Sequence, residues 1–292
     1  MPSIKPEYPL DSNLLAVMRE VDAQIREMKL SYFVCGAVAR DILLHHVHGI
    51  RTGRTTADVD FAVAVESWEQ FYEIKDRLIK TGRFEAAGRI AQRLYYRSGS
   101  GSEDYPLDII PFGRVENPAN SIKWPPDGNE VMSVIGYTDV LATTVEIEVE
   151  KNLLVPVISL PGLALLKLFA WTERGTQNPK DATDLVTLLC NYHDAGNDDR
   201  LFGEELELLE AAGFDPAIAS PQLLGKDIRR IARPETLKQA IAILENPKQV
   251  YRLVTHMAPT LRHAPDPVEE AERLLEKLRT GLRGPVNIRR NF

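Results

Sequence analysis

Two aspartates separated by one valine, Asp58 and Asp60, stand where a polar stretch passes into the apolar run "FAVAV". Such a run is typical of a buried strand. Residues i and i+2 of a strand point to the same side, so both carboxylates are expected on one face. Like charges at that spacing repel, whereas Mg²⁺ binds carboxylate oxygens together with substrate phosphates. The pair therefore predicts metal-assisted phosphoryl chemistry.

A third carboxylate occurs in a second apolar strand, "LDIIPFG", where Asp108 is surrounded by aliphatic residues. An ionisable side chain in such a strand is costly without a partner. If the two strands are neighbours, all three carboxylates reach the same metal site, and a third carboxylate near both ions would help two-metal phosphoryl transfer. In the alternative interpretation Asp58 only caps the strand, and Asp60 forms an ion pair with Arg51 or Arg54.

The elements before this pair suggest a phosphate-binding turn. The segment "SYFVCG" (31–36) predicts a buried strand, and 37–47 predicts a helix, so Gly36 lies at their junction. A glycine there lets phosphate approach the backbone N–H groups. A basic loop with Thr55 and Thr56 then leads into the aspartate pair. Alternatively, Gly36 only permits a tight turn.

The rest of the chain divides into a mixed half and a helical half. Its periodicity predicts helices over 12–29, 66–82, 160–174 and 180–192, and strands over 58–65, 93–98, 107–113 and 143–150. The last part of the chain consists of helices punctuated by Pro216, Pro221, Pro234, Pro247, Pro259, Pro265 and Pro267. We therefore predict an α+β fold, a mixed sheet with flanking helices over residues 1–155, followed by a helical domain over 156–292.

Composition narrows the function classes. Residues 221–292 carry 14 Lys and Arg against 8 Asp and Glu, whereas residues 1–220 carry 21 against 34. A basic C-terminal quarter can bind a phosphate backbone or can simply be solvated. The N-terminus resembles no signal peptide and no run is long enough to span a membrane, so a cytoplasmic protein is expected. Cys35 and Cys190 are expected to be buried, reduced thiols.

The order of strand, glycine, helix, paired aspartates and later acidic strand resembles the nucleotidyltransferase superfold of DNA polymerase β over residues 30–113. A second block, "SLPGLALLKLFAWTERGTQNPKDATDL" (159–185), resembles the Lys-x-x-Ala…Arg…Lys-Asp-x-x-Asp-Leu block of AbiEii/AbiGii-type nucleotidyltransferases. That family includes toxins of bacterial toxin–antitoxin and abortive-infection systems. The chain departs from the usual Gly-Gly or Gly-Ser pair by having Gly36-Ala37.

The resemblance implies roles for individual residues. Asp58 and Asp60 would hold Mg²⁺, and Asp108 would be the third metal-binding carboxylate and the base on the acceptor hydroxyl. Nucleotide-binding and further catalytic roles would fall to Gly36, Ala37, Thr55, Thr56, Lys167, Lys180 and Asp181. The helical domain would complete the site.

Some of these residues also have purely structural explanations. Lys167 lies in the apolar run "GLALLKLFAW" and can extend its ammonium to the surface. Asp181 suits a helix start preceded by Asn178 and Pro179. Asp184 is expected at the surface or paired with an arginine. The acidic stretch 193–200 lacks the spacing of a calcium loop and is expected to be solvated.

These observations predict a Mg²⁺-dependent enzyme that moves a nucleotide monophosphate from an NTP to an acceptor. The resemblance and the basic C-terminal quarter favour RNA, such as a tRNA 3′ end, as the acceptor of an AbiEii-like toxin with a cognate antitoxin. Two alternatives stay open. One is transfer to a small molecule or a protein hydroxyl, and the other is a non-catalytic nucleotide-binding or antitoxin module.

Overall fold

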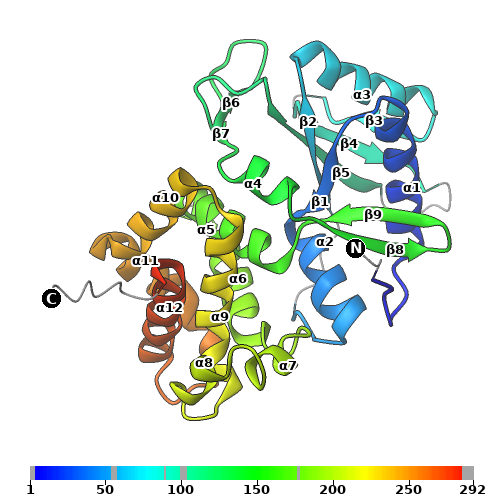
Figure 1. Cartoon of the computed structure of the whole chain (residues 1–292). Coiled ribbons are helices and arrows are strands. Elements are labelled where there is room, and N and C mark those ends of the chain that lie inside the picture. Colours follow the sequence, from blue (N-terminus) through cyan, green and yellow to red (C-terminus); the bar gives the residue numbers. More distant parts are fainter. Residues whose placement is uncertain (1–3, 54–57, 89, 99–103, 176–177, 285–292) are drawn as a thin grey trace, which may run out of the picture. The chain divides into compact units, whose positions relative to one another are not determined.

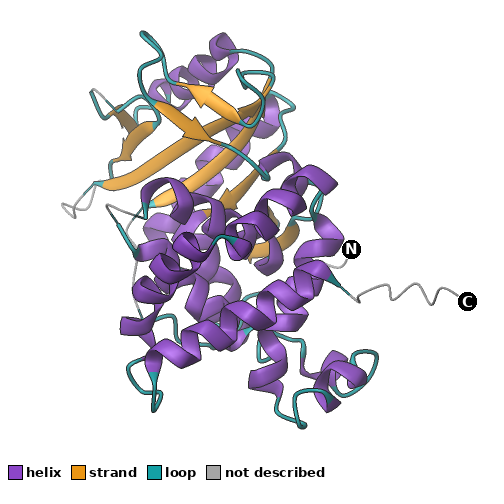
Figure 2. Ribbon diagram, turned by 90° about the vertical axis from the view of Figure 1, so that its left-hand side faces the viewer, coloured by secondary structure: helices purple, strands orange, loops and turns teal. Residues whose placement is uncertain are grey.

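A computed structural model describes the chain except for residues 1–3, 54–57, 89, 99–103, 176–177 and 285–292. Its backbone divides into two compact units, Met1–Ser159 and Leu160–Phe292 (Figure 1). The strands belong to the first unit, and the described part of the second is helical (Figure 2). The fold is therefore α+β, with a mixed sheet, flanking helices and a helical C-terminal half.

A seven-stranded sheet forms the core of the first unit, in the order β3-β4-β5-β2-β1-β9-β8. The strands are β1 (Tyr32–Cys35), β2 (Val59–Val65), β3 (Phe84–Ala86), β4 (Arg93–Tyr96), β5 (Tyr105–Gly113), β8 (Val145–Glu150) and β9 (Leu153–Val157). The strands β6 (Ser121–Lys123) and β7 (Val131–Ser133) form a separate hairpin. β2 runs parallel to β5 and antiparallel to β1, so the sheet is mixed.

Helices cover the sheet because their apolar residues recur at helical spacing. α1 (Ser12–Glu27) begins at Asp11, whose carboxylate accepts from two backbone N–H groups. α3 (Trp68–Lys80) begins at Ser67, packs against α1 and contacts β2. The other helical elements of this unit are α2 (Gly36–Asp41), the π-helical turn Ile42–Val47 that continues it, and α4 (Tyr137–Leu141).

Three local expectations differ from the structure. β3 was not predicted, because three residues are too short for a periodic signal. β9 was missed because Pro156 suggested the end of the mixed half; the strand accepts this proline since it pairs with β1 only at Val157. Cys190 is half-buried, whereas Cys35 is buried as expected.

The second unit contains α5 (Leu160–Arg174), α6 (Lys180–Asn191), α7 (Asp198–Leu201), α8 (Leu206–Glu210), α9 (Pro216–Ile231), α10 (Pro234–Glu245), α11 (Pro247–Met257), a 3₁₀ turn (Ala258–Leu261) and α12 (Pro267–Arg283). Four of the prolines begin helices, where the missing N–H costs nothing. Pro221 instead lies inside α9. No helix among the described residues is long and apolar enough to cross a membrane.

The backbones of α9 and α12 touch where two glycines face each other. A Cβ on Gly225 would lie 2.3 Å from the carbonyl oxygen of Leu278, and a Cβ on Gly281 would lie 2.2 Å from that of Gln222. Neither backbone oxygen can move aside without shifting a helix. The contact between these helices therefore depends on the absence of side chains at both positions.

We expect Gly281→Ala to lower the free energy of unfolding of the second unit by about 1–3 kcal/mol, because the methyl group forces the two helices apart. Thr280→Ala, at the adjacent exposed position of α12, is the matched control and should change stability little. Urea denaturation followed by circular dichroism measures both. Equal stability of the two variants would contradict the close contact.

Candidate active site

The structure places two of the predicted carboxylates side by side. Asp60 on β2 and Asp108 on β5 are register partners in the parallel pair, so their side chains leave the same face of neighbouring strands. Such strands lie about 4.8 Å apart. Asp108 is buried and Asp60 is half-buried. The prediction that the strands carrying these residues are neighbours is confirmed.

Asp58 precedes the first residue of β2, and an arginine connects it with Asp108. The Nε and Nη2 atoms of Arg93 donate to the two carboxylate oxygens of Asp108 at 2.8 and 2.7 Å. The same Nη2 atom lies 4.0 Å from Oδ2 of Asp58. The bonds with Asp108 raise the pKa of Arg93, against the opposing effect of burial. All three carboxylates therefore gather at one place on the sheet.

Sequence reasoning missed Arg93. It is the first residue of β4 and the direct cross-strand partner of Asp108 in an antiparallel pair. The available signal was an arginine at the start of the predicted strand 93–98, but only the pairing of β4 with β5 shows what it faces. Arg51, one of the suggested ion-pair partners of Asp60, is exposed, and Arg54 lies outside the described residues.

Gly36 is required where β1 turns into α2. Its φ is +72°, and a Cβ built on it would lie 1.9 Å from Oδ2 of Asp60. An L side chain disfavours this backbone conformation, and here it would also occupy the position of the carboxylate. Ala37, the next residue, is buried in the first turn of α2. The sequence predicted that a phosphate approaches Gly36, and this stays a prediction; in this structure the carboxylate of Asp60 lies against Gly36.

Two further predicted residues of the first unit, Thr55 and Thr56, lie outside the described residues.

A tyrosine also lies close to the aspartates. Tyr105 is the first residue of β5. Burial raises its pKa to about 12, and the charges of Asp11, Asp58 and Asp41 act in the same direction. A phenol with this pKa stays protonated at neutral pH.

A second set of predicted residues forms a buried ionic cluster in the other unit. The Nζ atom of Lys167 on α5 lies 3.1 Å from Oδ1 of Asp181 and 2.5 Å from Oδ2 of Asp184, both on α6. Arg174 donates to both carboxylate oxygens of Asp181, at 2.7 and 3.0 Å. The side chains of Asp181 and Asp184 are 3% and 0% exposed, whereas Arg174 is 57% exposed.

This cluster corrects two expectations. Asp184 is fully buried and paired with Lys167, so the expectation of a surface residue was wrong. Lys167 does not extend to the surface, because two carboxylates neutralise its ammonium inside the unit. Burial lowers the pKa of Lys167, but the charges of Asp184 and Asp181 outweigh it and raise the pKa overall. Lys180, at the start of α6, is exposed.

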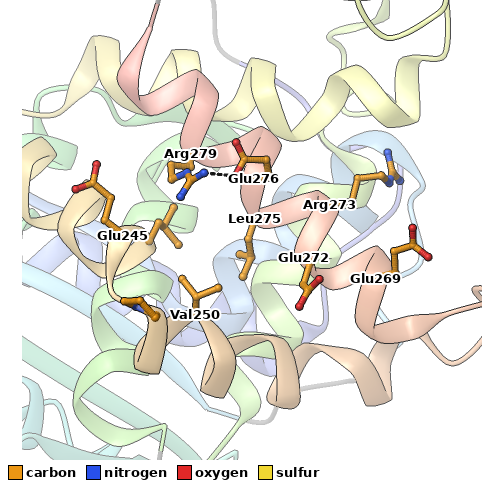
Figure 3. Close-up of a pocket in the computed structure, with 10 residues that line it drawn as sticks. Glu245, Val250, Glu269, Glu272, Arg273, Leu275, Glu276 and Arg279 are labelled. Atoms are coloured by element: carbon orange, nitrogen blue, oxygen red, sulfur yellow. Dashed lines mark hydrogen bonds and ion pairs between the residues drawn. The ribbon is translucent and has the colours of Figure 1, made fainter.

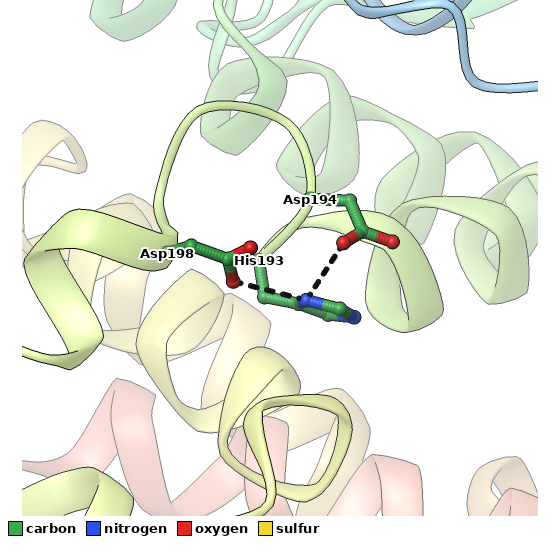
Figure 4. A group of neighbouring side chains, drawn as sticks. All are labelled: His193, Asp194 and Asp198. Atoms are coloured by element: carbon green, nitrogen blue, oxygen red, sulfur yellow. Dashed lines mark hydrogen bonds and ion pairs between the residues drawn. The ribbon is translucent and has the colours of Figure 1, made fainter.

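Two other features of the second unit lie outside this cluster. Nδ1 of His193 is 3.2 Å from a carboxylate oxygen of Asp194 and of Asp198 (Figure 4). Both aspartates are exposed. Ala195 and Asn197 between them are buried and α7 begins at Asp198, so the expectation of a solvated loop holds only in part. A groove of about 530 Å³ lies among α10, α11 and α12, with glutamates and arginines around apolar side chains (Figure 3). None of the predicted site residues lines it.

The match to a family model shows that the chain is a nucleotidyltransferase. A model of the family described as "Nucleotidyl transferase AbiEii toxin, Type IV TA system" matches residues 33–249. The chain belongs to this AbiEii family. Comparison with curated protein sequences finds no match.

Several solved structures are similar to the chain at low sequence identity. An antigenic nucleotidyltransferase-like protein from Paracoccidioides brasiliensis is 14% identical, with a TM-score of 0.43, covering 73% of this chain and 95% of that one. ANT(2")-Ia in complex with adenylyl-2"-tobramycin is 15% identical, with a TM-score of 0.38, covering 69% and 97%. The Thermotoga maritima CCA-adding enzyme complexed with tRNA is 12% identical, with a TM-score of 0.26, covering 94% and 82%.

Membership of the family implies an NTP substrate and typically a divalent metal ion. The residues present fit such an ion. Asp58, Asp60 and Asp108 supply hard oxygen donors, which is the chemistry that Mg²⁺ and Mn²⁺ prefer. The missing side chain at Gly36 leaves room for the carboxylate of Asp60.

We expect Gly36→Ala to weaken Mn²⁺ binding by about tenfold or more, because the new methyl group displaces the carboxylate of Asp60. Gly82→Ala is the matched control, since Gly82 has a φ of +74° with nothing within 4 Å of a built Cβ. Both variants incur the same backbone strain, of about 1–2 kcal/mol. Isothermal titration with Mn²⁺ measures the difference. Equal metal affinity in the two variants would contradict the proposed role of Gly36.

We expect Lys167→Met to lower the free energy of unfolding by about 3–5 kcal/mol, because two buried carboxylates lose their shared counterion. Lys180→Met, at the exposed start of α6, should change stability by less than about 1 kcal/mol. Urea denaturation provides the comparison. A loss below about 1 kcal/mol in Lys167→Met would show that the ammonium does not hold the cluster together.

Proposed function

We propose that this enzyme is a Mg²⁺-dependent toxin that transfers a nucleotide monophosphate from an NTP to RNA. The register pairing of Asp60 with Asp108 carries the proposal, because it brings carboxylates from two strands to one metal-binding position. Membership of the AbiEii family supports the toxin assignment and a cognate antitoxin. A cytoplasmic location is consistent with this activity.

The three carboxylates have two proposed roles, metal binding and proton acceptance. Asp58, Asp60 and Asp108 would hold one or two Mg²⁺ ions, and such ions would supply positive charge to neutralise the phosphates. Asp108 also accepts the proton of the acceptor hydroxyl. The hydroxyl oxygen forms a bond to the α-phosphorus, the bond to the β,γ-diphosphate breaks, and pyrophosphate leaves. A carboxylate has about four lone-pair sites, so Asp108 keeps acceptor capacity beyond its two bonds with Arg93.

We propose that Gly36 and Ala37 lie against the phosphates, with help from Thr55 and Thr56. Contact of Lys167 and Lys180 with the nucleotide, and a catalytic role for Asp181, stay predictions. The ion pairs of Lys167 favour a holding role, in which it fixes Asp181 while Arg174 presents the exposed charge of the cluster.

The basic C-terminal quarter supports RNA as the acceptor. Residues 221–292 carry 14 Lys and Arg against 8 Asp and Glu, and this segment belongs to the helical unit. We propose that the helical unit binds the phosphate backbone of a tRNA or another RNA. The net charge of −7 favours the alternative acceptor, a small molecule or a protein hydroxyl. Salt dependence of RNA association separates the two, because only backbone binding weakens steeply with salt.

We expect purified protein with Mg²⁺, total RNA and each α-labelled NTP in turn to label a discrete RNA band. Asp58→Ala and Asp60→Ala should lose on the order of 10³-fold in rate, because several kcal/mol of charge stabilisation disappear. Asp127→Ala, at an exposed aspartate of the same unit, is the control and should label normally. Label in protein or in a small molecule would redirect the proposal to that acceptor, and no NTP binding at all would contradict it.

A further inference from the structure

We propose that Arg93 is a positioning residue that sets both the orientation of Asp108 and the charge of the metal site. The inference rests on the proposed function, since it assumes that Asp58, Asp60 and Asp108 bind a divalent metal ion. It adds a residue that neither the aspartate motif nor the second sequence block contains.

The guanidinium of Arg93 forms a bidentate contact, called the fork below, with the carboxylate of Asp108. Two nitrogens of Arg93 bond separately to the two oxygens of Asp108, which fixes the plane of the carboxylate as a single bond cannot. The same guanidinium reaches Asp58 at 4.0 Å. One side chain on β4 therefore touches carboxylates from two different segments of the chain.

The backbone that carries Arg93 is itself held from two sides. The buried Lys75 on α3 donates from Nζ to the carbonyl oxygen of Ala91. On the other side, the amide of Ile109 on β5 donates to the carbonyl oxygen of Gln92 at 3.0 Å. These bonds fix the residues just before Arg93 relative to Asp108. The backbone that carries the guanidinium is therefore held in place, which a positioning residue requires.

The contact between Arg93 and Asp108 is expected to have two opposite effects, one on metal binding and one on the rate of transfer. Its positive charge lies beside the ligands, so it weakens the attraction of the carboxylates for a second cation. Its geometry holds Asp108 ready for metal and acceptor hydroxyl, so it speeds transfer. A residue that only stabilised the fold would change metal binding and transfer in the same direction. Removing Arg93 should instead change them in opposite directions.

The test compares Arg93→Gln, which removes the charge, with Arg93→Lys, which keeps the charge but loses the fork. Arg97→Gln is the matched control, because Arg97 follows the same strand, is exposed and pairs with Glu85. Isothermal titration with Mn²⁺ alone gives the metal affinity without any acceptor. Single-turnover transfer of α-labelled nucleotide to RNA gives the rate, and thermal unfolding confirms that each variant is folded.

We expect Arg93→Gln to bind Mn²⁺ about tenfold more tightly and to transfer about 100-fold more slowly. Arg93→Lys should keep wild-type Mn²⁺ affinity within about threefold and still transfer at least tenfold more slowly, since an ammonium cannot form the fork. Arg97→Gln should match the wild type in both. If Arg93→Gln does not fold, slowed transfer by folded Arg93→Lys at unchanged Mn²⁺ affinity supports the proposal, because a merely structural loss would lower both.

Weaker Mn²⁺ binding in folded Arg93→Gln, or an unchanged rate in Arg93→Lys, would overturn the proposal. Failure of the proposed function looks different. If the wild type labels no acceptor but binds Mn²⁺, tighter binding by Arg93→Gln still supports the effect of Arg93 on site charge. If Asp58→Ala and Asp60→Ala bind Mn²⁺ as the wild type does, the metal ion does not bind at these aspartates. That result would contradict both the proposed metal site and the proposed role of Arg93.

Discussion

Repulsion between carboxylates on neighbouring strands is the constraint on which the first unit depends. β2 and β5 run parallel with Asp60 directly beside Asp108, and Asp58 lies one residue before β2. Nothing in the folding of a sheet favours this arrangement, because like charges held close together raise each other's free energy. In this structure the positive charge of Arg93 offsets part of the repulsion. Under the proposed function, a metal ion would offset the rest.

The surrounding elements make that arrangement rigid. The apolar residues of β2 and β5 bury both strands in the middle of the sheet, so the aspartates cannot move apart without disturbing the core. At one end, Gly36 turns the chain without a side chain and leaves room for Asp60. On the other side β4 brings Arg93 to Asp108. A site of this kind combines high charge with little freedom, which suits phosphoryl transfer.

In the helical unit, cationic side chains compensate two neighbouring carboxylates. Asp181 and Asp184 lie on one side of α6, and Lys167 on α5 neutralises both from inside. Arg174 adds a second cation from the solvent side. For Asp181, burial by itself would raise the pKa, but the bonds from Arg174 and the charge of Lys167 lower it, so the carboxylate stays ionised. The block that carries the family resemblance is therefore also an internal ionic support.

The sequence by itself determined the fold class, the place of Asp58 and Asp60 at the start of a strand, and the need for glycine at position 36. These follow from local periodicity and from chemistry that is visible within a few residues. Only the tertiary structure decided that Arg93 faces Asp108 and that Asp184 is buried against Lys167. The physical reason is that strand order and helix packing bring together residues far apart in the chain, and local propensity contains no information on which partner a charge will meet.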